Sequence, residues 1–465
     1  MASGIDVQVI ETSSLGDRSY LATDGEVALA VDPQRDVDRV IALAGRLGVR
    51  ITHVLETHLH NDYVSGGLEL SRLTGATYAM AADDRVSFQR MPIADGDVVE
   101  VSPNLRVRVI ATPGHTFHHL SYALEGPQGV EGVFTGGSLL FGTTGRTDLL
   151  GHEHAETLAR HQHASAHKLA DLLPEGAHVW PTHGFGSFCS AAQTEGDAST
   201  VGREKELNPA LRLASEEFVT ETLSGLDAYP AYYAHMGVIN LDGPDPVDLR
   251  APTTADPLQL RRRLDAGEWV VDLRHRRAYV RAHLAGTVSL ALDGSMATWL
   301  GWMIDWGAPV TLLGESTEQV ATAQRELVRI GIDRVAAAAT GAPEDLAAAP
   351  DQVRSMDTAD FAALSAALEG SAPDGLPAPE VVLDVRMGNE WNASHVVGAV
   401  HIPLPELPHR LGEVPDGAVW VHCASGYRAT AAASVLARAG RSVVVVDDAF
   451  DTAADQGVPM TAEPA

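Results

Sequence analysis

The first half of the chain alternates short apolar runs of strand length with stretches of helical period. Residues 7–11 (VQVIE) and 27–33 (VALAVDP) are rich in β-branched residues and are bounded by turn residues, which predicts two strands. Residues 36–48 (DVDRVIALAGRLG) place apolar side chains at helical spacing and end in a glycine, which predicts a helix. Strands alternating with helices indicate an α/β domain built in layers.

Three further apolar runs lead directly into histidines. Residues 51–57 (ITHVLET) run into the motif THLHNDY, residues 106–115 (RVRVIATPGH) end at His115, and residues 178–184 (HVWPTHG) contain His183. A rigid strand fixes a side chain at its end, and the following loop exposes that side chain. Catalytic or metal-binding residues are therefore expected at these strand ends.

The second half contains an internal repeat. DLRHRRAYVRAHLAGTVSLAL begins at Asp272 and DVRMGNEWNASHVVGAVHIPL begins at Asp384, and the two align without a gap at an offset of 384 − 272 = 112. Two copies of one small α/β domain with a parallel sheet account for this most simply, over residues 258–345 and 356–460.

The Pro- and Asp-rich segment 241–257 (LDGPDPVDLRAPTTADP) is typical of a linker and would end a first domain over residues 1–240.

The composition limits the kinds of partner that these domains can bind. The net charge of −29 over 465 residues argues against nucleic acid or an anionic membrane surface, since both require a basic patch. We find neither an apolar run of about 18 residues nor a secretory signal, and the two cysteines, Cys189 and Cys423, make no disulfide framework. We therefore expect no membrane partner and a cytoplasmic location, and a homo-oligomer is compatible with the composition.

The loop Cys423-Ala-Ser-Gly-Tyr-Arg428 lies between a predicted strand and an Ala-rich predicted helix. Its backbone N–H groups, from Ser425, Gly426 and Tyr427, and the helix dipole would form an anion-binding cradle. Cys423 would be present there as a thiolate, with Arg428 as a fixed positive charge.

This loop resembles the rhodanese active site, and residues 381–449 resemble the rhodanese frame. The resemblance implies a sulfurtransferase in which Cys423 carries a persulfide. A cysteine phosphatase is the competing use of such a cradle, but those enzymes usually place five residues between Cys and Arg, and here there are four. The first copy has Gly314 and Gln319 at the corresponding positions, so we expect no sulfur transfer there.

His58, His60 and Asp62 in THLHNDY, with His115 and His183, have the residue types and strand-end placement of a metal site. The motifs HxHxD, TPGHT, FTG, GRTD and PTHG resemble the metallo-β-lactamase fold over about residues 7–213. They are most similar to its persulfide dioxygenase branch, which is close to the glyoxalase II hydrolases. We therefore expect an αββα sandwich followed by two rhodanese-like domains.

The resemblance implies one Fe(II) held by His58, His115 and the Asp of an FTGD motif, but this chain has Gly137 at that position. The remaining set is His58, His60 and His115, with Asp62 and His183 nearby, which would suit one Fe(II) or one Zn(II). The resemblance also places Arg146 of GRTD near the carboxylates of a thiol substrate.

Three functions follow from these patterns. The first is a persulfide dioxygenase-like domain that converts glutathione persulfide, or another low-molecular-weight persulfide, and O₂ to sulfite, coupled to rhodanese transfer that involves sulfite or thiosulfate. The second is a zinc-dependent, glyoxalase II-like thioester hydrolase. The third is a metal-poor, non-catalytic domain that feeds or regulates the rhodanese, and Gly137 favours this reading.

Overall fold

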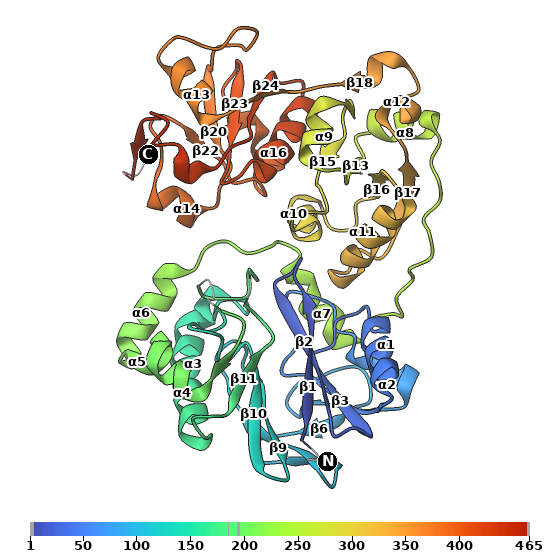
Figure 1. Cartoon of the computed structure of the whole chain (residues 1–465), viewed down its shortest axis with the longest axis vertical. Coiled ribbons are helices and arrows are strands. Elements are labelled where there is room, and N and C mark those ends of the chain that lie inside the picture. Colours follow the sequence, from blue (N-terminus) through green and yellow to red (C-terminus); the bar gives the residue numbers. More distant parts are fainter. Residues whose placement is uncertain (1–3, 185, 193–195, 463–465) are drawn as a thin grey trace. The chain divides into compact units, whose positions relative to one another are not determined.

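The computed structural model describes residues 4–184, 186–192 and 196–462. The chain divides into two compact units, of which the first comprises residues 1–247 and 328–331 and the second comprises residues 248–327 and 332–465. Figure 1 shows the elements of both units, coloured along the sequence. The division at residue 247 falls within the segment predicted to be a linker, although helix α7 (Tyr233–Asp242) continues into that segment.

Two mixed sheets form the first unit. One is ordered β1-β2-β3-β4-β5-β6 and the other β12-β11-β10-β9-β8-β7. The strands of the first sheet are β1 (Asp6–Thr12), β2 (Asp17–Thr23), β3 (Val27–Val31), β4 (Arg50–Leu55), β5 (Thr77–Ala81) and β6 (Met91–Ile93). Those of the second are β7 (Val98–Ser102), β8 (Leu105–Ala111), β9 (Leu120–Gly126), β10 (Gly129–Gly136), β11 (His178–Pro181) and β12 (Ser199–Thr200).

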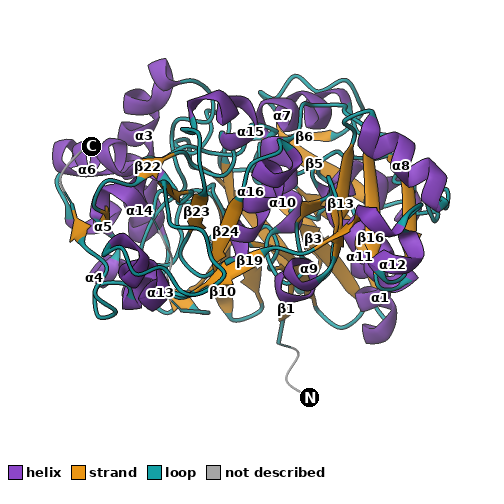
Figure 2. Ribbon diagram, turned by 90° about the horizontal axis from the view of Figure 1, so that it is seen from above, coloured by secondary structure: helices purple, strands orange, loops and turns teal. Residues whose placement is uncertain are grey.

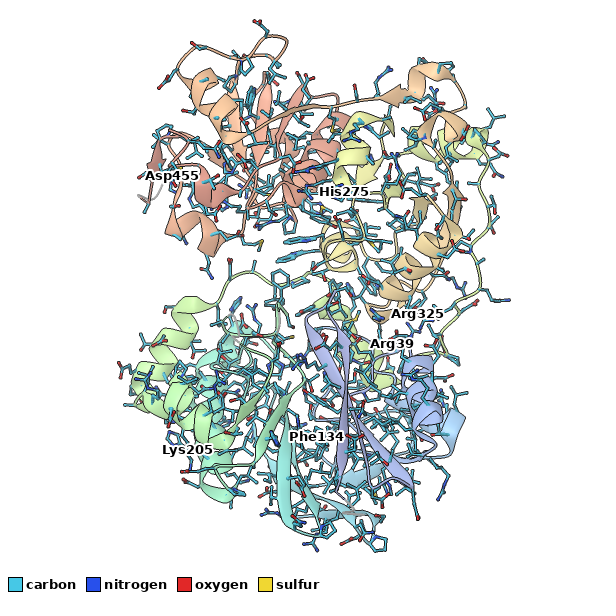
Figure 3. The ribbon with its side chains drawn as sticks, in the orientation of Figure 1. Arg39, Phe134, Lys205, His275, Arg325 and Asp455 are labelled. Atoms are coloured by element: carbon cyan, nitrogen blue, oxygen red, sulfur yellow. The ribbon has the colours of Figure 1, made fainter. Side chains whose placement is uncertain are left out.

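The two sheets pack face to face, with helices on the outside. Leu29 and Leu55 of the first sheet share a buried cluster with Val107, Tyr122 and Phe134 of the second, and Figure 3 labels Phe134 in this interior. The helices are α1 (Asp38–Leu47), α2 (Gly67–Thr74), α3 (His152–Leu172), α4 (Val201–Leu207), α5 (Pro209–Arg212), α6 (Ser215–Gly225) and α7. Buried side chains of α1 and α2 cover the first sheet and those of α3 cover the second, which confirms the αββα prediction.

The second unit repeats one strand order twice. Its parallel sheets are β15-β13-β16-β17 and β22-β20-β23-β24-β19, so the first four strands of each correspond. The first copy contains α8 (Pro257–Asp265), β13 (Trp269–Asp272), α9 (Arg276–Arg281), β14 (His283–Leu284), β15 (Val288–Ser289), α10 (Met296–Met303), β16 (Val310–Gly314), α11 (Thr317–Arg329), β17 (Val335–Thr340) and α12 (Pro343–Leu346).

The second copy contains β18 (Val353–Arg354), β19 (Asp357–Ala359), α13 (Phe361–Leu368), β20 (Val381–Asp384), α14 (Gly388–Ala393), β21 (His395–Val396), β22 (Val400–His401), α15 (Leu407–Arg410), β23 (Val419–His422), α16 (Tyr427–Arg438), β24 (Val443–Val446) and β25 (Met460–Thr461). Its β18 pairs back with β14 of the first copy. Figure 2 shows helices α13, α14 and α16 with strands β22, β23 and β24 of this copy.

The repeat extends to individual hydrogen bonds. Arg274 Nη2 donates to Asp272 Oδ2 at 2.7 Å, and Arg386 Nη2 donates to Asp384 Oδ2 at 2.6 Å. In each copy the same guanidinium also donates to the backbone carbonyl eight residues later. The gapless alignment of the sequence therefore describes two domains with one common internal frame.

None of the helices within the described ranges combines the length and apolarity that crossing a bilayer requires.

Candidate metal centre and cysteine site

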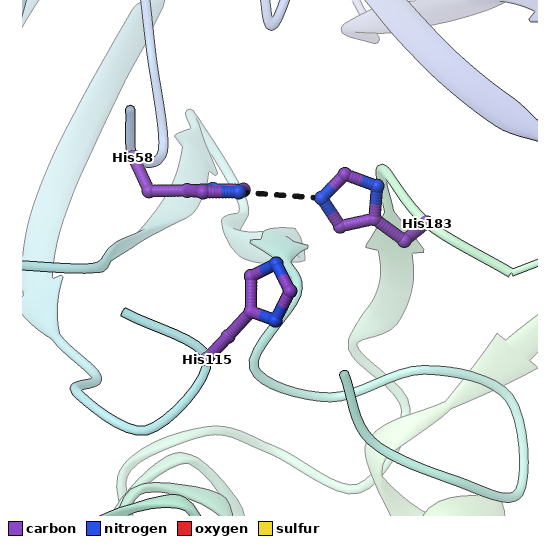
Figure 4. Close-up of side chains that lie close together, drawn as sticks. All are labelled: His58, His115 and His183. Carbon is purple, nitrogen blue, oxygen red and sulfur yellow. Dashed lines mark hydrogen bonds between the residues drawn. The ribbon is translucent and has the colours of Figure 1, made fainter. Parts of the chain in front are cut away.

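The ends of three strands gather the predicted histidines into one buried cluster. His58 and His60 follow β4, His115 follows β8, and His183 follows β11. None of these four side chains is more than 2% exposed. Figure 4 shows the rings of His58, His115 and His183 turned toward one another. Their ligand atoms lie within 4.8 Å of one another, and the two Nε2 atoms of His58 and His183 are 3.3 Å apart.

His60, a predicted ligand, has three oxygen atoms around one of its ring nitrogens. Its Nε2 lies 3.0 Å from Tyr63 Oη, 3.2 Å from Glu56 Oε2 and 3.4 Å from Asp32 Oδ1. Burial alone would lower the pKa of His60, but the carboxylates of Asp32 and Glu56 raise it to about 10. His60 therefore belongs to a buried ionic network beside the three-histidine group.

Asp62 contacts His183 on the side away from His58. His183 Nδ1 lies 3.1 Å from Asp17 Oδ1 and 3.2 Å from Asp62 Oδ2. Burial would lower the pKa of His183, but the two carboxylates raise it to about 9. Through this contact Asp62 orients an imidazole. Its predicted role as a direct ligand stays a prediction, since Asp62 also belongs to a possible ligand group with His60 and His183. Asp17 was not predicted, because it lies at the start of β2, far from the histidine motifs.

His58 and His115 each have one ring nitrogen held by an oxygen atom. His58 Nδ1 is 2.9 Å from Thr57 Oγ1, and His115 Nδ1 is 2.8 Å from the carbonyl oxygen of Arg146. Burial lowers the pKa of His115 to about 3, with a further contribution from His183, and burial and the neighbouring histidines lower the pKa of His58. Both rings are therefore neutral at physiological pH and can act as ligands.

Gly137 leaves the space that His115 occupies. An ideal Cβ at Gly137 would lie 2.3 Å from His115 Cδ2, and one at Gly145 would lie 2.7 Å from His115 Nδ1. An aspartate at position 137 could not simply be added to the present centre, because its Cβ would collide with the ring. The rings of His58, His115 and His183 nevertheless fit a divalent ion, since imidazole nitrogens are ordinary ligands of zinc and iron. Metal binding would release the additional proton of His183.

Arg146 lies in the interior, with its donors directed at other protein groups. Nε and Nη2 donate to the two oxygens of Asp148 at 2.7 and 2.8 Å, and Nη2 also donates to the carbonyl oxygen of Asp227 at 2.7 Å. Nη1 donates to the carbonyl oxygen of Phe188 at 3.2 Å. Only 3% of the surface of Arg146 is exposed. Its side chain shapes the loop in which its own carbonyl oxygen contacts His115 Nδ1. This placement does not support the predicted contact with a substrate carboxylate.

The predicted cysteine loop lies between β23 and α16. Gly426 N donates to Cys423 Sγ at 3.1 Å, and Gly426 has φ = 93°, a conformation in which glycine is strongly favoured. Cys423 is buried, whereas Ser425 is exposed. A backbone N–H group and the amino end of α16 therefore both face the sulfur, as in the predicted anion-binding cradle.

Glu390 holds the arginine of this loop. Arg428 Nη1 and Nη2 donate to the two carboxylate oxygens of Glu390 at 2.5 and 2.7 Å, so that the guanidinium is fixed by a bidentate pair. Glu390 was not among the residues predicted from the sequence. The repeat alignment contained a signal, because the equivalent position in the first copy, 390 − 112 = 278, is Ala278. The acid is therefore present only in the copy that has the cysteine and the arginine.

The first copy packs against the cysteine loop of the second. Tyr427 Oη donates to the carbonyl oxygen of Ala291 at 2.9 Å, so the Tyr427 side chain is used for packing. Trp299 of α10 lies with its ring centre 5.7 Å from Arg428 Cζ. The first copy thus contributes to the surroundings of Cys423 although it has no cysteine of its own.

Comparisons with known proteins identify similar proteins for both halves of the chain. The family model described as "Rhodanese-like domain" matches residues 364–454. The "Persulfide dioxygenase ETHE1, mitochondrial" of Bos taurus is 30% identical over 245 residues, which cover 52% of this chain and 81% of that protein. The "Hydroxyacylglutathione hydrolase" of Gloeobacter violaceus is 30% identical over 202 residues, which cover 42% of this chain and 75% of that protein.

The chain belongs to the metallo-β-lactamase-fold family of persulfide dioxygenases and hydroxyacylglutathione hydrolases. A solved metallo-β-lactamase from Staphylococcus aureus is 28% identical, with a TM-score of 0.64, and the match covers 73% of this chain and 99% of that one. The predicted fold class and family, with a rhodanese domain at the carboxyl end, are therefore confirmed. Membership in this family implies a metal cofactor and a role in sulfur metabolism.

Proposed function

We propose that the chain is an enzyme with two sites, in which a metal centre in the first unit oxidises a low-molecular-weight persulfide and Cys423 transfers sulfane sulfur. The observation that carries this proposal is the geometry of the cysteine loop. A buried sulfur receives an N–H hydrogen bond at the start of α16, and Arg428 is fixed beside it. The two free cysteines of the chain fit a reducing, cytoplasmic compartment.

Sulfur transfer at Cys423 balances without an external oxidant. A persulfide RSSH reacts with the Cys423 thiolate to give RSH and Cys423–S–S⁻, as the S–S bond of the donor breaks and a new S–S bond forms at Sγ. Attack of SO₃²⁻ on the outer sulfur then gives S₂O₃²⁻ and regenerates the thiolate. Arg428 supplies the positive charge that attracts sulfite and thiosulfate, and the small loop admits a single sulfur atom more readily than a phosphate.

Persulfide oxidation in the first unit would supply that sulfite. The overall reaction is RSSH + O₂ + H₂O → RSH + SO₃²⁻ + 2H⁺, with O₂ as the oxidant. A bound Fe(II) would supply O₂ activation, and His58, His115 and His183 are the residues that could hold it. The similarity to a persulfide dioxygenase over 81% of that protein's length supports this reaction for the first unit.

A zinc-dependent thioester hydrolase is the second candidate for the first unit. Three imidazoles with one open position form a common ligand set of catalytic zinc, which activates water. The similarity to a hydroxyacylglutathione hydrolase supports this reading too. A domain that only binds persulfide and delivers it to Cys423 is the third candidate.

Activity assays on single variants separate these functions. Cys423→Ser should abolish thiosulfate:cyanide sulfurtransferase activity, whereas Cys189→Ala, at a buried cysteine of the first unit, should retain it. Persisting activity in Cys423→Ser would remove Cys423 from its role as sulfur carrier. Oxygen uptake with glutathione persulfide identifies the dioxygenase, thioester cleavage identifies the hydrolase, and neither activity leaves the first unit as a binding domain.

A further inference from the structure

The first copy of the repeat carries two arginines that the second copy lacks. Arg276 and Arg277 begin helix α9 of the first copy. At the repeat offset of 112, the second copy has Gly388 and Asn389 at these positions. The two arginines are therefore not part of the internal frame that both copies share, and their role has to come from their own contacts.

Both arginines bind one carboxylate of the second copy. Arg276 Nε donates to Asp447 Oδ1 at 2.8 Å, and Arg277 Nε donates to Asp447 Oδ2 at 2.9 Å. The side chains of Asp447 and Arg276 are 15% and 20% exposed, whereas that of Arg277 is 61% exposed. Arg276 therefore makes the stronger pair, since solvent weakens exposed ion pairs. Two guanidinium groups meet one carboxylate, which leaves a net positive charge.

This positive group lies beside the cysteine loop. Strands β23 and β24 are parallel neighbours, so Cys423 after β23 and Asp447 after β24 lie at the same edge of the sheet. Ligands of open α/β sheets bind at that edge. An ideal Cβ at Gly426 would overlap Asp447 Oδ1 and would lie 3.1 Å from Arg276 Nε. Gly426 is also the residue whose N–H group donates to Cys423 Sγ.

The charges beside the loop give these arginines a role in the binding of anions. Arg428 pairs with Glu390, so that these two side chains together carry no net charge. The cysteine thiolate and Asp447 are both negative, and thiosulfate or sulfite brings two further negative charges. Like charges at short range repel unless cations compensate them. Arg276 and Arg277 provide that compensation, because without them Asp447 would be an unpaired carboxylate beside the loop.

We propose that Arg276 and Arg277 of the first copy, held by Asp447, determine how strongly anionic sulfur donors and acceptors bind at Cys423. The first copy, which has no cysteine at the equivalent position, thus supplies the electrostatic part of the second copy's site. The proposal rests on the proposed function in that Cys423 carries sulfur. The transfer itself is unchanged. The S–S bond of thiosulfate breaks as its outer sulfur bonds to the thiolate, sulfite leaves, and cyanide removes the sulfur as thiocyanate.

The test uses the full-length chain and two sulfur donors of different charge, with cyanide as the acceptor. Thiosulfate carries two negative charges and benzenethiosulfonate carries one. Arg276→Gln should lower kcat/KM about tenfold for thiosulfate and about threefold for benzenethiosulfonate, because the Coulomb energy is proportional to the charge of the donor. Arg277→Gln should have a smaller effect with the same dependence on charge, since its side chain is more exposed. Added salt should reduce the differences between the variants and the wild type.

Two further variants separate charge from structure. Arg281→Gln removes the same charge from the other end of α9, where the side chain is exposed, and should leave both values unchanged. The double variant Arg276→Gln/Asp447→Asn restores the net charge beside the loop and should recover most of the lost activity with thiosulfate.

An equal decrease for the two donors would overturn the proposal, because a purely structural role affects both alike. An unchanged kcat/KM for thiosulfate in a folded Arg276→Gln variant would overturn it as well. If Arg276→Gln fails to fold by circular dichroism, the ratio of the two donors in Arg277→Gln decides. Sulfur transfer that persists in Cys423→Ser would refute the proposed function and this proposal together. An unchanged donor ratio with an inactive Cys423→Ser variant would refute this proposal alone.

Discussion

Replacing Gly137 by alanine should displace His115 from the metal centre. The new Cβ would lie 2.3 Å from His115 Cδ2, whereas carbon atoms in contact stay about 3.5 Å apart, so the ring must move by roughly 1.2 Å. The close approach of Gly145 and the hydrogen bond from Nδ1 to the carbonyl oxygen of Arg146, at 2.8 Å, restrict that movement.

The structure sets the size of the effect on stability. Overpacking of a filled interior lowers the free energy of unfolding by about 1–3 kcal/mol. Breaking the hydrogen bond at Nδ1 would add about 1–3 kcal/mol, because both partners are buried. For a domain of 150–250 residues each kcal/mol lowers Tm by roughly 2–4 °C. Displacement of one of three ligands should also lower the affinity for Co(II) at least tenfold.

Calorimetry of the metal-free chain and Co(II) titration measure the two effects. Gly176→Ala is a matched control, since an added Cβ there meets no atom within 4 Å. We expect the control to unfold and to bind Co(II) like the wild type. A Gly137→Ala variant that matches the control in both Tm and Co(II) affinity would refute the packing of His115 against Gly137.

Four further predictions concern the second unit and the metal. Arg428→Lys should lower kcat/KM for thiosulfate about tenfold, because lysine cannot make the bidentate pair with Glu390. An unchanged kcat/KM in steady-state kinetics would show that the Arg428–Glu390 pair is not needed for sulfur transfer. Asp384→Asn should cost about 3–5 kcal/mol in urea unfolding, since it leaves the charge of Arg386 buried without its partner, whereas the exposed Asp416→Asn should cost less than about 0.5 kcal/mol. Burial opposes ionisation of Asp384, but His422 and Arg386 lower its folded pKa below that of a free aspartate. The contribution of Asp384 to stability is therefore present above the pKa of a free aspartate and should disappear as pH falls through the lower folded pKa. Zinc at 100 times its Kd should stabilise the wild-type chain by about 2.7 kcal/mol in thermal unfolding, and removal by a chelator should reverse this.

Strand ends and loop motifs could be predicted because they depend on local sequence. The runs before His115 and His183 have strand length and composition, and the structure places both histidines just after β8 and β11. The cysteine loop lies between β23 and α16, as its flanking residues indicate. The repeat offset of 112 also predicted two domains with the same strand order.

The direction of each side chain could not be predicted, because it depends on partners far away in sequence. His60 turns toward Asp32, which is 28 residues earlier in the chain and lies on a neighbouring strand end. His183 is oriented by Asp17, 166 residues away. Burial of Arg146 likewise follows from carbonyl groups of two later segments. Motif spacing indicates which residues meet, and the tertiary hydrogen bonds decide which of them can bind a metal.

The central claim is that the first unit oxidises a persulfide independently of the rhodanese. It is tested most directly by oxygen consumption of the Fe(II)-loaded Cys423→Ser variant with glutathione persulfide, with sulfite measured as product. One O₂ consumed and one sulfite formed for each persulfide is the predicted result, because the balanced reaction requires that ratio. Absence of oxygen uptake in a variant that holds one iron per chain would contradict the claim.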